Sequence, residues 1–478
     1  MKHIFTAALI VTIYLSGFAD YTVLSSNNTS HYIEYLRARD VLEYNIREYP
    51  LNTGQSEEEL YSRCNNKTDS IITAYVSRQL YTRGIRLAGN AGYGYENGHH
   101  LNSHIAANLR TNNLEYYASL RTLMPYAGNE DVNALRLKEW NNTGSYIDNA
   151  YIGYRSNRNY IIAGRFLPAW GIGLYDNLFI SDNIYSPDGI LFNIHYKFMD
   201  FSYYTNTLSP SHVSMRYDTA RRYSAYHKLS MDIPGENRLS LKEIVIYSAP
   251  YPMPFYINPF MIYYGVQWNI HTDDNIIWAI EWNNSYLRDI LFTVELFVDD
   301  FVYEKELEAL FKEFTLYAPD KLAVNMQMNV LYFSPMLIEL EYTRLSNWTG
   351  THRHTENSYA YYSEPVLFST GPDSDVSALR ISYPAGRFFF SGSLFYIRNG
   401  EGSINDSFVE MTGQEYELPF PSGIVEYTTG IKGNIVFNIS NSMDLCISSG
   451  VSRIINYRNT ADDNRIISDI SLEWGWMF

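Results

Sequence analysis

Cysteine is scarce in this sequence. The 478 residues contain two, Cys64 and Cys446, which most of the chain separates. So few and so distant, they exclude a disulfide framework and the closely spaced ligands of a structural zinc site. Two alternatives remain for the pair: one disulfide formed in an oxidising compartment, or two unpaired thiols. We expect no metal and no cofactor.

A long hydrophobic run suited to a membrane-spanning helix is also missing. Beyond the first 19 residues, Ile244–Trp268 is the one long stretch without charge. It carries prolines at 250, 252, 254 and 259, and such a density of proline removes backbone donors and breaks a helix. An exported chain without a spanning helix must be soluble or a closed β-barrel, because only helices and closed barrels satisfy the backbone in lipid.

Catalytic signatures are absent. There is no Gly-x-Ser-x-Gly elbow, no His-Glu-x-x-His and no phosphate-binding glycine loop. His99–His100, Asp273–Asp274 and Asp299–Asp300 are adjacent pairs, and adjacent strand residues point to opposite faces. We therefore expect no enzyme, although a hydrolase that gathers its residues from distant strands stays open.

Positive charge is in deficit. The formal net charge of -16 argues against a nucleic-acid partner. It also suits a neutral or basic polymer better than a polyanion, unless local clusters of Arg and Lys override the total.

The first 19 residues have the pattern of a secretory signal. A basic start with Lys2 and an apolar run, Ile4–Leu15, precede small residues at the two cleavage-determining positions. The run is too short to span a bilayer. The mature chain is expected to begin at Asp20, exported after cleavage.

The last nine residues form an amphipathic strand pattern. One face carries Ile470, Leu472, Trp474, Trp476 and Phe478, because side chains alternate with period two. Such an ending resembles the assembly signal of bacterial outer-membrane barrels, read by the barrel-assembly machinery, with aromatics at the lipid interface. The alternative is a terminal strand of a soluble sheet, and removing Phe478 would then leave folding unchanged.

Aromatic residues are plentiful and the middle of the chain alternates. Forty-four Tyr, 24 Phe and 8 Trp suit a barrel with aromatic girdles at two interfaces. From about Gly84 the period is two, as in Ile190–Phe198, Tyr223–Met231 and Ile276–Trp282. At about 22 residues per strand and loop, residues 84–478 predict an all-β antiparallel membrane barrel of about 18 strands. Polar stretches at 344–365 and 399–421 are expected to be external loops.

Residues 20–83 differ from the barrel region. Helical spacing in His31–Glu43, an acidic first turn at Ser56 and a third candidate over Thr68–Leu80 predict a small helical region. Helices fit a barrel wall poorly, so we expect this region at the periplasmic end. A loosely ordered extension is the alternative.

An ordered series of motifs runs from residue 150 to 301. Its members are Ala150-Tyr-Ile-Gly-Tyr154, Ile161-Ile-Ala-Gly-Arg165, Trp170-Gly-Ile-Gly173, Asn177-Leu-Phe-Ile-Ser181, Tyr226-His-Lys-Leu229, Leu239–Tyr247, Tyr256-Ile-Asn-Pro-Phe260, Asn275 and Glu295–Phe301. In order and spacing the series resembles the Wzi family of capsule-assembly outer-membrane proteins. Arg47-Glu-Tyr-Pro-Leu51 is similar to that family's N-terminal Arg-Pro-Leu region, whereas Ile172 stands where the family usually has proline.

The resemblance implies a monomeric barrel in the outer membrane of a Gram-negative bacterium, with an N-terminal helical part at its periplasmic end. It further implies a lectin role, in which the barrel holds capsular or exported polysaccharide at the cell surface without catalysis. The main alternative is a porin or solute channel with an open lumen. A soluble all-β lectin or glycoside hydrolase is a third class.

Eight residues of the series are candidate lumen or glycan positions: Arg165, Trp170, Gly171, Gly173, His227, Glu243, Asp299 and Asp300. Arg165 would reach a glycan carboxylate or pair with a lumen acid, Glu243 or Asp299.

The other candidates have ordinary structural interpretations too. Trp170 and its glycines predict either a close backbone approach or an interfacial turn. His227 is expected to be a buried or girdle side chain. Glu243 is expected in the lumen beside a cation, since a lone charge on the lipid face is costly. Asp299 and Asp300 are expected at a solvated strand end, with a cation-binding ring as the alternative.

Overall fold

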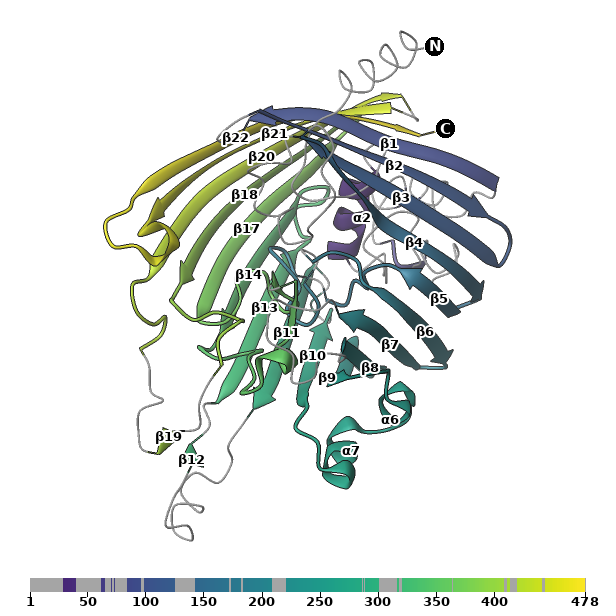
Figure 1. Cartoon of the computed structure of the whole chain (residues 1–478). Coiled ribbons are helices and arrows are strands. Elements are labelled where there is room, and N and C mark those ends of the chain that lie inside the picture. Colours follow the sequence, from purple (N-terminus) through teal and green to yellow (C-terminus); the bar gives the residue numbers. More distant parts are fainter. Residues whose placement is uncertain are drawn as a thin grey trace.

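The alternating stretches form strands that close into a barrel of 18 antiparallel strands (Figure 1). This computed structural model describes residues 29–39, 62–64, 70, 73, 84–95, 99–124, 142–208, 221–300, 316–317, 320–407, 411–412 and 419–477, except 172, 182, 183, 286, 288, 363, 441 and 442. Each barrel strand pairs with the next along the chain, and the last pairs with the first. The expected fold class and strand number are confirmed.

The strands of the barrel are β1 Gly84–Tyr95, β2 His99–Arg110, β3 Leu114–Met124, β4 Gly144–Ser156, β5 Asn159–Arg165, β6 Asp188–Tyr196, β7 Met199–Leu208, β8 Arg221–Ile233, β9 Asn237–Ala249, β10 Asn275–Asn284, β11 Ile290–Asp300, β13 Lys321–Val330, β14 Leu337–Leu345, β17 Ser374–Ala385, β18 Phe388–Asn399, β20 Glu426–Ser440, β21 Met443–Ile455 and β22 Arg465–Met477. Two small pairs lie outside the barrel sheet, β12 Leu316–Tyr317 with β19 Met411–Thr412, and β15 Ala360–Tyr361 with β16 Glu364–Pro365.

Helices are few. They are α2 Thr29–Ala38, α6 Pro254–Ile257 and α7 Tyr263–Ile270, with 3-10 turns η1 Thr355–Asn357 and η2 Tyr457–Asn459. In the part of the chain that the structure describes, no helix has the length and apolarity needed to cross a membrane.

The barrel wall has a polar inner face and an apolar outer face. On β14, Glu339, Glu341 and Thr343 point inward and are buried, whereas Leu340 and Tyr342 point outward and are exposed. This is the inverse of a soluble protein and matches a wall that meets lipid outside. Buried charged groups on this inner face, such as Glu339 and Glu341, need partners.

The two ends of the barrel differ in their connections. At one end, here the short-turn end, neighbouring strands are joined through residues 111–113, 157–158, 197–198, 234–236, 331–336 and 386–387. The other end, the long-loop end, carries the connections 166–187, 250–274, 346–373 and 400–425. In Figure 1 the C-terminus lies at the top and α7, β12 and β19 lie at the bottom, at the long-loop end.

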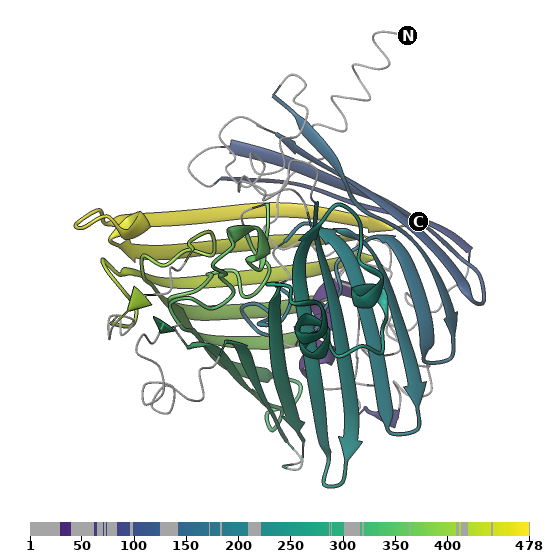
Figure 2. The same cartoon turned by 60° about the horizontal axis from the view of Figure 1, so that its bottom comes forward.

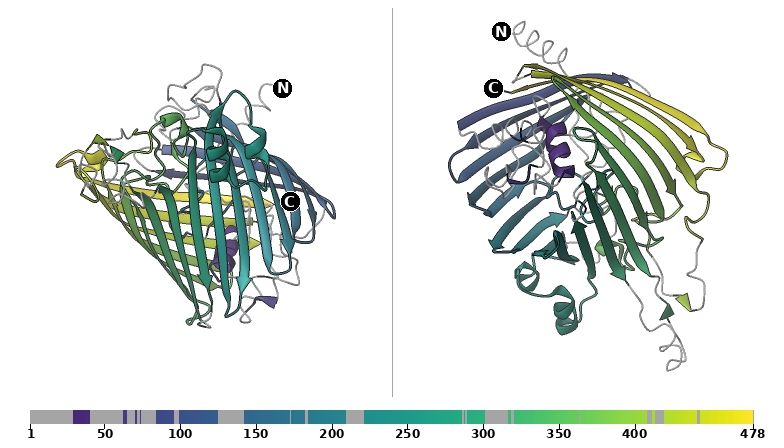
Figure 3. Two further views of the ribbon diagram at one scale, coloured as in Figure 1. Left: turned by 90° about the horizontal axis from the view of Figure 1, so that it is seen from below. Right: turned by 180° about the vertical axis from the view of Figure 1, so that it is seen from behind.

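Helix α2 lies inside the ring of strands, as Figure 1 and the right-hand view of Figure 3 show. Tyr35 donates its hydroxyl to the carbonyl of Pro335 (2.9 Å), in the turn between β13 and β14, and Asn329 donates to the carbonyl of Ala38 (2.7 Å). The helix therefore sits near the short-turn end. It overlaps the first expected helical stretch, His31–Glu43, but begins at Thr29 and ends at Ala38, while most of the other two stretches lies outside the described residues.

The terminal strand closes the barrel. On β22, Trp476 pairs with Gly89 of β1, and Ile470 and Leu472 are exposed on the outer face as the alternation predicts. Phe478 lies outside the described residues, so the assembly signal stays a prediction. Cys64 and Cys446 do not form a disulfide in this structure, and the Cys64 thiol lies 3.2 Å from the hydroxyl of Thr73.

Candidate functional site

Two long connections turn inward and fill the lumen toward the long-loop end. The first inner segment, residues 166–187, joins β5 to β6, and the second, residues 346–373, joins β14 to β17. Phe166, Trp170 and Phe179 of the first segment and Tyr359 and Phe368 of the second are fully buried inside the barrel. Trp170 of the first segment stacks on Phe179 (6.2 Å between ring centroids) and meets Tyr226 of β8 edge-on (6.1 Å).

The two inner segments are bonded to each other. The amide of Ser181 donates to the carbonyl of Val366 (2.6 Å), and the hydroxyl of Tyr359 donates to the carbonyl of Phe179 (2.7 Å). Asp176 accepts from both segments, from the Ser181 hydroxyl (2.8 Å) and the Ser369 amide (2.5 Å). The segments therefore form one body inside the barrel, here called the lumen body.

Arg222 holds the lumen body to the wall. Its side chain points inward from β8, is fully buried, and donates to three carbonyls of the second inner segment: Glu356 (2.6 Å), Ser358 (2.5 Å) and Ala360 (2.9 Å). A guanidinium has donors enough for all three, in a planar fork. Removal of this side chain would leave three buried carbonyls without their donor.

Two acids of the wall bind backbone amides of the lumen body. Glu341 of β14 accepts from the amides of Leu174 and Tyr175. Asp299 of β11 accepts from the amide of Gly350 (2.7 Å) and lies 3.6 Å from the ammonium of Lys321. The lumen body is thus fixed by acidic and basic side chains from several strands.

A buried charge triad lies deeper on the same side of the wall. Lys242 of β9 contacts the carboxylates of Glu281 and Glu295 (2.7 Å to Glu295), and all three side chains are buried. The Lys242 ammonium also lies 5.0 Å from the ring centroid of Phe179, so it meets the lumen body as well.

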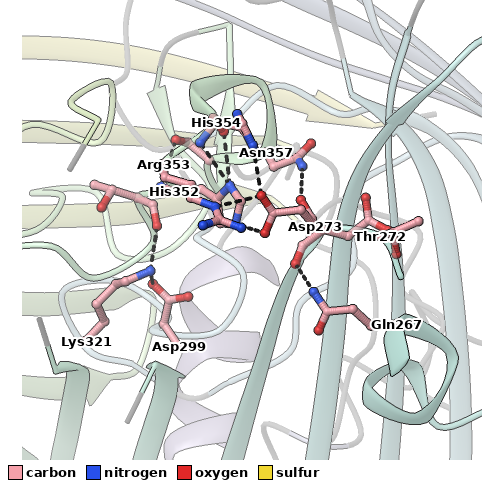
Figure 4. Close-up of polar contacts among 12 residues, drawn as sticks. Gln267, Thr272, Asp273, Asp299, Lys321, His352, Arg353, His354 and Asn357 are labelled. Carbon is pink, nitrogen blue, oxygen red and sulfur yellow. Dashed lines mark hydrogen bonds and ion pairs between the residues drawn. The ribbon is translucent and has the colours of Figure 1, made fainter. Parts of the chain in front are cut away.

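At the rim of the long-loop end, a cluster around Asp273 ties the second inner segment to the connection 250–274 (Figure 4). Arg353 Nε and His354 Nε2 lie 2.7 and 2.8 Å from Asp273 Oδ2, and His352 Nε2 lies 3.8 Å from Oδ1. Asn357 donates to the carbonyl of Asp273 (2.8 Å). Burial alone would raise the pKa of Asp273, but the hydrogen bond from Arg353 and the neighbouring histidines outweigh it and lower the pKa.

The Asp273 cluster should make stability fall in mild acid. Burial, helped by the nearby Lys321 charge, lowers the pKa of His352 from 6.5 to about 4. The unfolded chain therefore binds more protons than the folded one between these values, and stability is lost as the pH falls from about 6.5 toward 4. The shift at His352 alone should make the free energy of unfolding, measured in urea, about 2 kcal/mol smaller at pH 5 than at pH 7.5.

His352→Gln should flatten that pH slope, because glutamine cannot take up the proton. The matched control is His271→Asn at an exposed left-handed position that asparagine tolerates, and it should keep the slope. An unchanged slope in His352→Gln would show that other groups govern the acid response.

The structure places the predicted site residues in three different environments. Arg165 pairs with Asp188, its cross-strand partner on β6 (2.7 Å), so the expected pairing with Glu243 or Asp299 is wrong. Its side chain is 39% exposed at the long-loop end. The partner was missed because strand register, not sequence distance, sets which residues face each other.

Trp170, Gly171 and Gly173 belong to the lumen body. Trp170 is fully buried, so the expectation of an interfacial turn with an anchoring indole is wrong. Gly171 has φ +143°, and a Cβ on Gly173 would collide with the carbonyl of Asp176, so both positions require glycine. The expected close approach of the backbone is therefore present, but it is made within the first inner segment. There the amide of Gly173 donates to Asn177 Oδ1 (3.1 Å).

His227 and Glu243 lie on the outer face of β8 and β9. The expected lumen position of Glu243 is therefore wrong. His227 Nδ1 lies 3.5 Å from Glu243 Oε2, and helix α7 covers both side chains. His227 is buried, as one of its two interpretations predicts.

Asp299 is buried in the lumen, which overturns the expected solvated strand end. It continues the alternation along β11 that also turns Glu295 and Phe297 inward. The side chain of Asp300 lies outside the described residues. Among the described residues, no group of His, Cys, Asp and Glu is placed to hold a metal.

The groups that organise the site were missed by the sequence. Arg222 and Lys242 stand in ordinary alternating strands, and no local signal marks them. The Asp273 cluster had a faint one, because the Asp273–Asp274 pair and the stretch Thr351-His-Arg-His-Thr355 carry unusual polar density in two separate loops.

Comparison with known proteins decides the fold. No family model matches the sequence, and no curated protein matches it. Among solved structures, Wzi of Escherichia coli, an outer membrane protein involved in group 1 capsule assembly and a carbohydrate-binding β-barrel, is similar over 94% of this chain and 98% of its own, with TM-score 0.64 and 12% identity. The fold is that of Wzi. The resemblance drawn from the ordered motifs is thereby confirmed at the level of the Wzi fold.

Two proteins of Pseudomonas aeruginosa are similar in outline. OccK5 matches 82% of this chain and 97% of its own with TM-score 0.47 and 10% identity, and OprD matches 83% and 94% with TM-score 0.45 and 8% identity.

Proposed function

We propose that this protein is a closed outer-membrane barrel that holds a surface polysaccharide at its long-loop end, without catalysis and without conducting solutes. The observation that carries the proposal is the lumen body, two inner segments bonded to each other and fixed by buried Arg222, Glu341 and Asp299. A solute channel would need that volume free. The Wzi fold supports the same role, because the carbohydrate-binding barrel of that name shares it.

The exposed rim around the lumen body offers chemistry that suits sugars. Arg165 and Asp188, the wall residues that flank the first inner segment, are 39% and 62% exposed. In the second inner segment the half-buried Tyr362 packs on Tyr361, which is 8% exposed, with ring centroids 4.7 Å apart. Aromatic faces take the apolar side of a sugar ring, and the charged groups bond its hydroxyls. Among the eight candidate positions, Arg165 alone combines a described, exposed side chain with a place at this rim, so we assign the glycan contact to it.

The proposal also fixes the orientation of the barrel in the membrane. The long loops face the outside of the cell and the short turns face the periplasm, as in outer-membrane barrels generally. Helix α2 then lies at the periplasmic end, where the N-terminal region was expected. Export through a cleaved signal and insertion by the barrel-assembly machinery as a monomer belong to the same proposal.

The experiment pairs conductance with binding. The intact chain in a planar bilayer should give no single-channel steps, and should be retained by immobilised surface polysaccharide purified from the producing cells. Arg165→Ala should weaken retention about tenfold, the value of one charge-assisted hydrogen bond.

Arg155→Ala is the matched control, since Arg155 lies at the opposite, short-turn end of β4, and it should bind as the wild type does. Steady conductance of the intact chain would overturn the closed barrel and favour a channel. Equal retention of both variants would remove Arg165 from the binding surface.

A further inference from the structure

A segment of the chain lies on the outside of the barrel wall. After β9 the connection turns back, and α6 and α7 lie against the outer face of β7, β8 and β9, as Figure 2 and the left-hand view of Figure 3 show. Inward-facing side chains of the segment pack on outward-facing side chains of the wall. They are Tyr256, Tyr263 and Val266 against Tyr203, Tyr223, Val245 and Tyr247.

Glu243 anchors this segment. One of its carboxylate oxygens accepts from the amides of Tyr263 (3.1 Å) and Tyr264 (3.4 Å), in the first turn of α7, and from the indole of Trp278 (3.1 Å). His227 Nδ1 lies 3.5 Å from the other oxygen of this carboxylate, and the imidazole stacks on the ring of Tyr263 (4.3 Å between centroids). An ionisable pair on the outer wall of a barrel is costly in lipid, and here protein covers it.

The free side of the segment is apolar. No charged residue occurs between positions 244 and 270. Its largest exposed side chains are hydrophobic, with Phe260 77%, Ile262 68% and Trp268 67% exposed. A surface of this kind facing water would be an aggregation hazard.

The backbone of the segment has few donors left over. Its four prolines carry no N–H, and the N–H groups of Tyr256, Ile257, Asn258, Met261 and Val266 bond to carbonyls within the segment. The amides of Met253 and Phe260 bond to the Tyr247 hydroxyl (3.3 Å) and to Asn258 Oδ1 (3.1 Å). Internal satisfaction of polar backbone groups is the condition that lipid imposes and water does not.

We propose that residues 250–270 are embedded in the membrane against the outer wall, and that lipid acyl chains cover their free side. The surface of the segment is continuous with the wall that meets lipid. Phe260 stacks on Phe201 of β7 (5.9 Å), and Tyr264 packs edge-on against Trp278 of β10 (5.8 Å). The helices therefore widen the lipid-facing surface on one side of the barrel and keep the His227–Glu243 pair dry.

Quenching of site-specific labels tests the proposal. In the full chain with Cys64→Ser and Cys446→Ser, a single cysteine at position 260, 262 or 268 carries a bimane fluorophore, and the protein is reconstituted into phosphatidylcholine vesicles. Each site is more than half exposed, so the substitutions remove little packing. Ile194→Cys on the bare wall and Ala461→Cys in the β21–β22 connection are the matched references for lipid and water.

The three labels should be quenched by doxyl-labelled lipid to within about twofold of the label at 194, because all four sites would face acyl chains. Aqueous iodide should quench the label at 461 and spare the other four. Quenching by iodide at 260, 262 and 268 would overturn the proposal. Shielding from both quenchers would overturn it too, because a second copy of the chain or another protein would then occupy this face.

Discussion

Arg222→Ala is expected to convert a silent barrel into one that conducts. The substitution removes the donor of three buried carbonyls in the second inner segment, at Glu356, Ser358 and Ala360. Leaving buried acceptors unpaired costs about 1–3 kcal/mol each. The lumen body should then detach from β8, and single-channel recordings should show steps that the wild type lacks.

Arg221→Ala is the matched control. Arg221 is the neighbouring residue of the same type, but it is exposed and points to the outer face, so its loss should leave the barrel silent. A second variant, in which a four-residue turn replaces residues 347–372, gives the largest conductance that removing the second inner segment can produce. Leu345 and Ser374 are direct partners across β14 and β17, so a short turn bridges them without stretching the wall. If neither Arg222→Ala nor the replacement conducts, the lumen is closed by another part of the chain.

Lys242→Met is expected to be the most destabilising single substitution in the wall. It leaves the carboxylates of Glu281 and Glu295 buried and facing each other without their cation. Breaking a buried ion pair by removing one partner costs about 3–5 kcal/mol. Urea unfolding of the reconstituted barrel should show a loss of that size, with the midpoint moving to lower urea.

Two further variants separate charge from packing. Lys197→Met, at an exposed turn, should stay within about 0.5 kcal/mol of the wild type. Adding Glu281→Gln and Glu295→Gln to Lys242→Met neutralises the stranded acids and should restore part of the loss. If the triple variant is no more stable than Lys242→Met, packing of the lysine stem rather than its charge is what matters.

Much of the wall could be predicted from the sequence. Alternation in Tyr223–Met231 and Ile276–Trp282 identified β8 and β10, and chain length per strand gave a barrel of the observed size. Period two is a local property, fixed by the pleat of each strand alone. For the same reason Ile470 and Leu472 were placed correctly on the outer face of β22.

The site depended on non-local facts. Glu243 shares its face with Leu241 and Val245, which correctly marks the outer wall, yet its charge argued for the lumen. The structure resolves that conflict with α7, a segment about 20 residues further on that supplies amide donors on the outside. Register likewise paired Arg165 with Asp188, and no spacing in the sequence gives register.

Both inner segments begin and end on neighbouring strands. Arg165 faces Asp188 and Leu345 faces Ser374, so each segment is an insertion within a single hairpin. Replacing one inner segment by another sequence changes the long-loop end of the barrel, and every strand of the wall keeps its neighbours. The long-loop end can therefore differ between related barrels while the pairing of the wall strands stays the same.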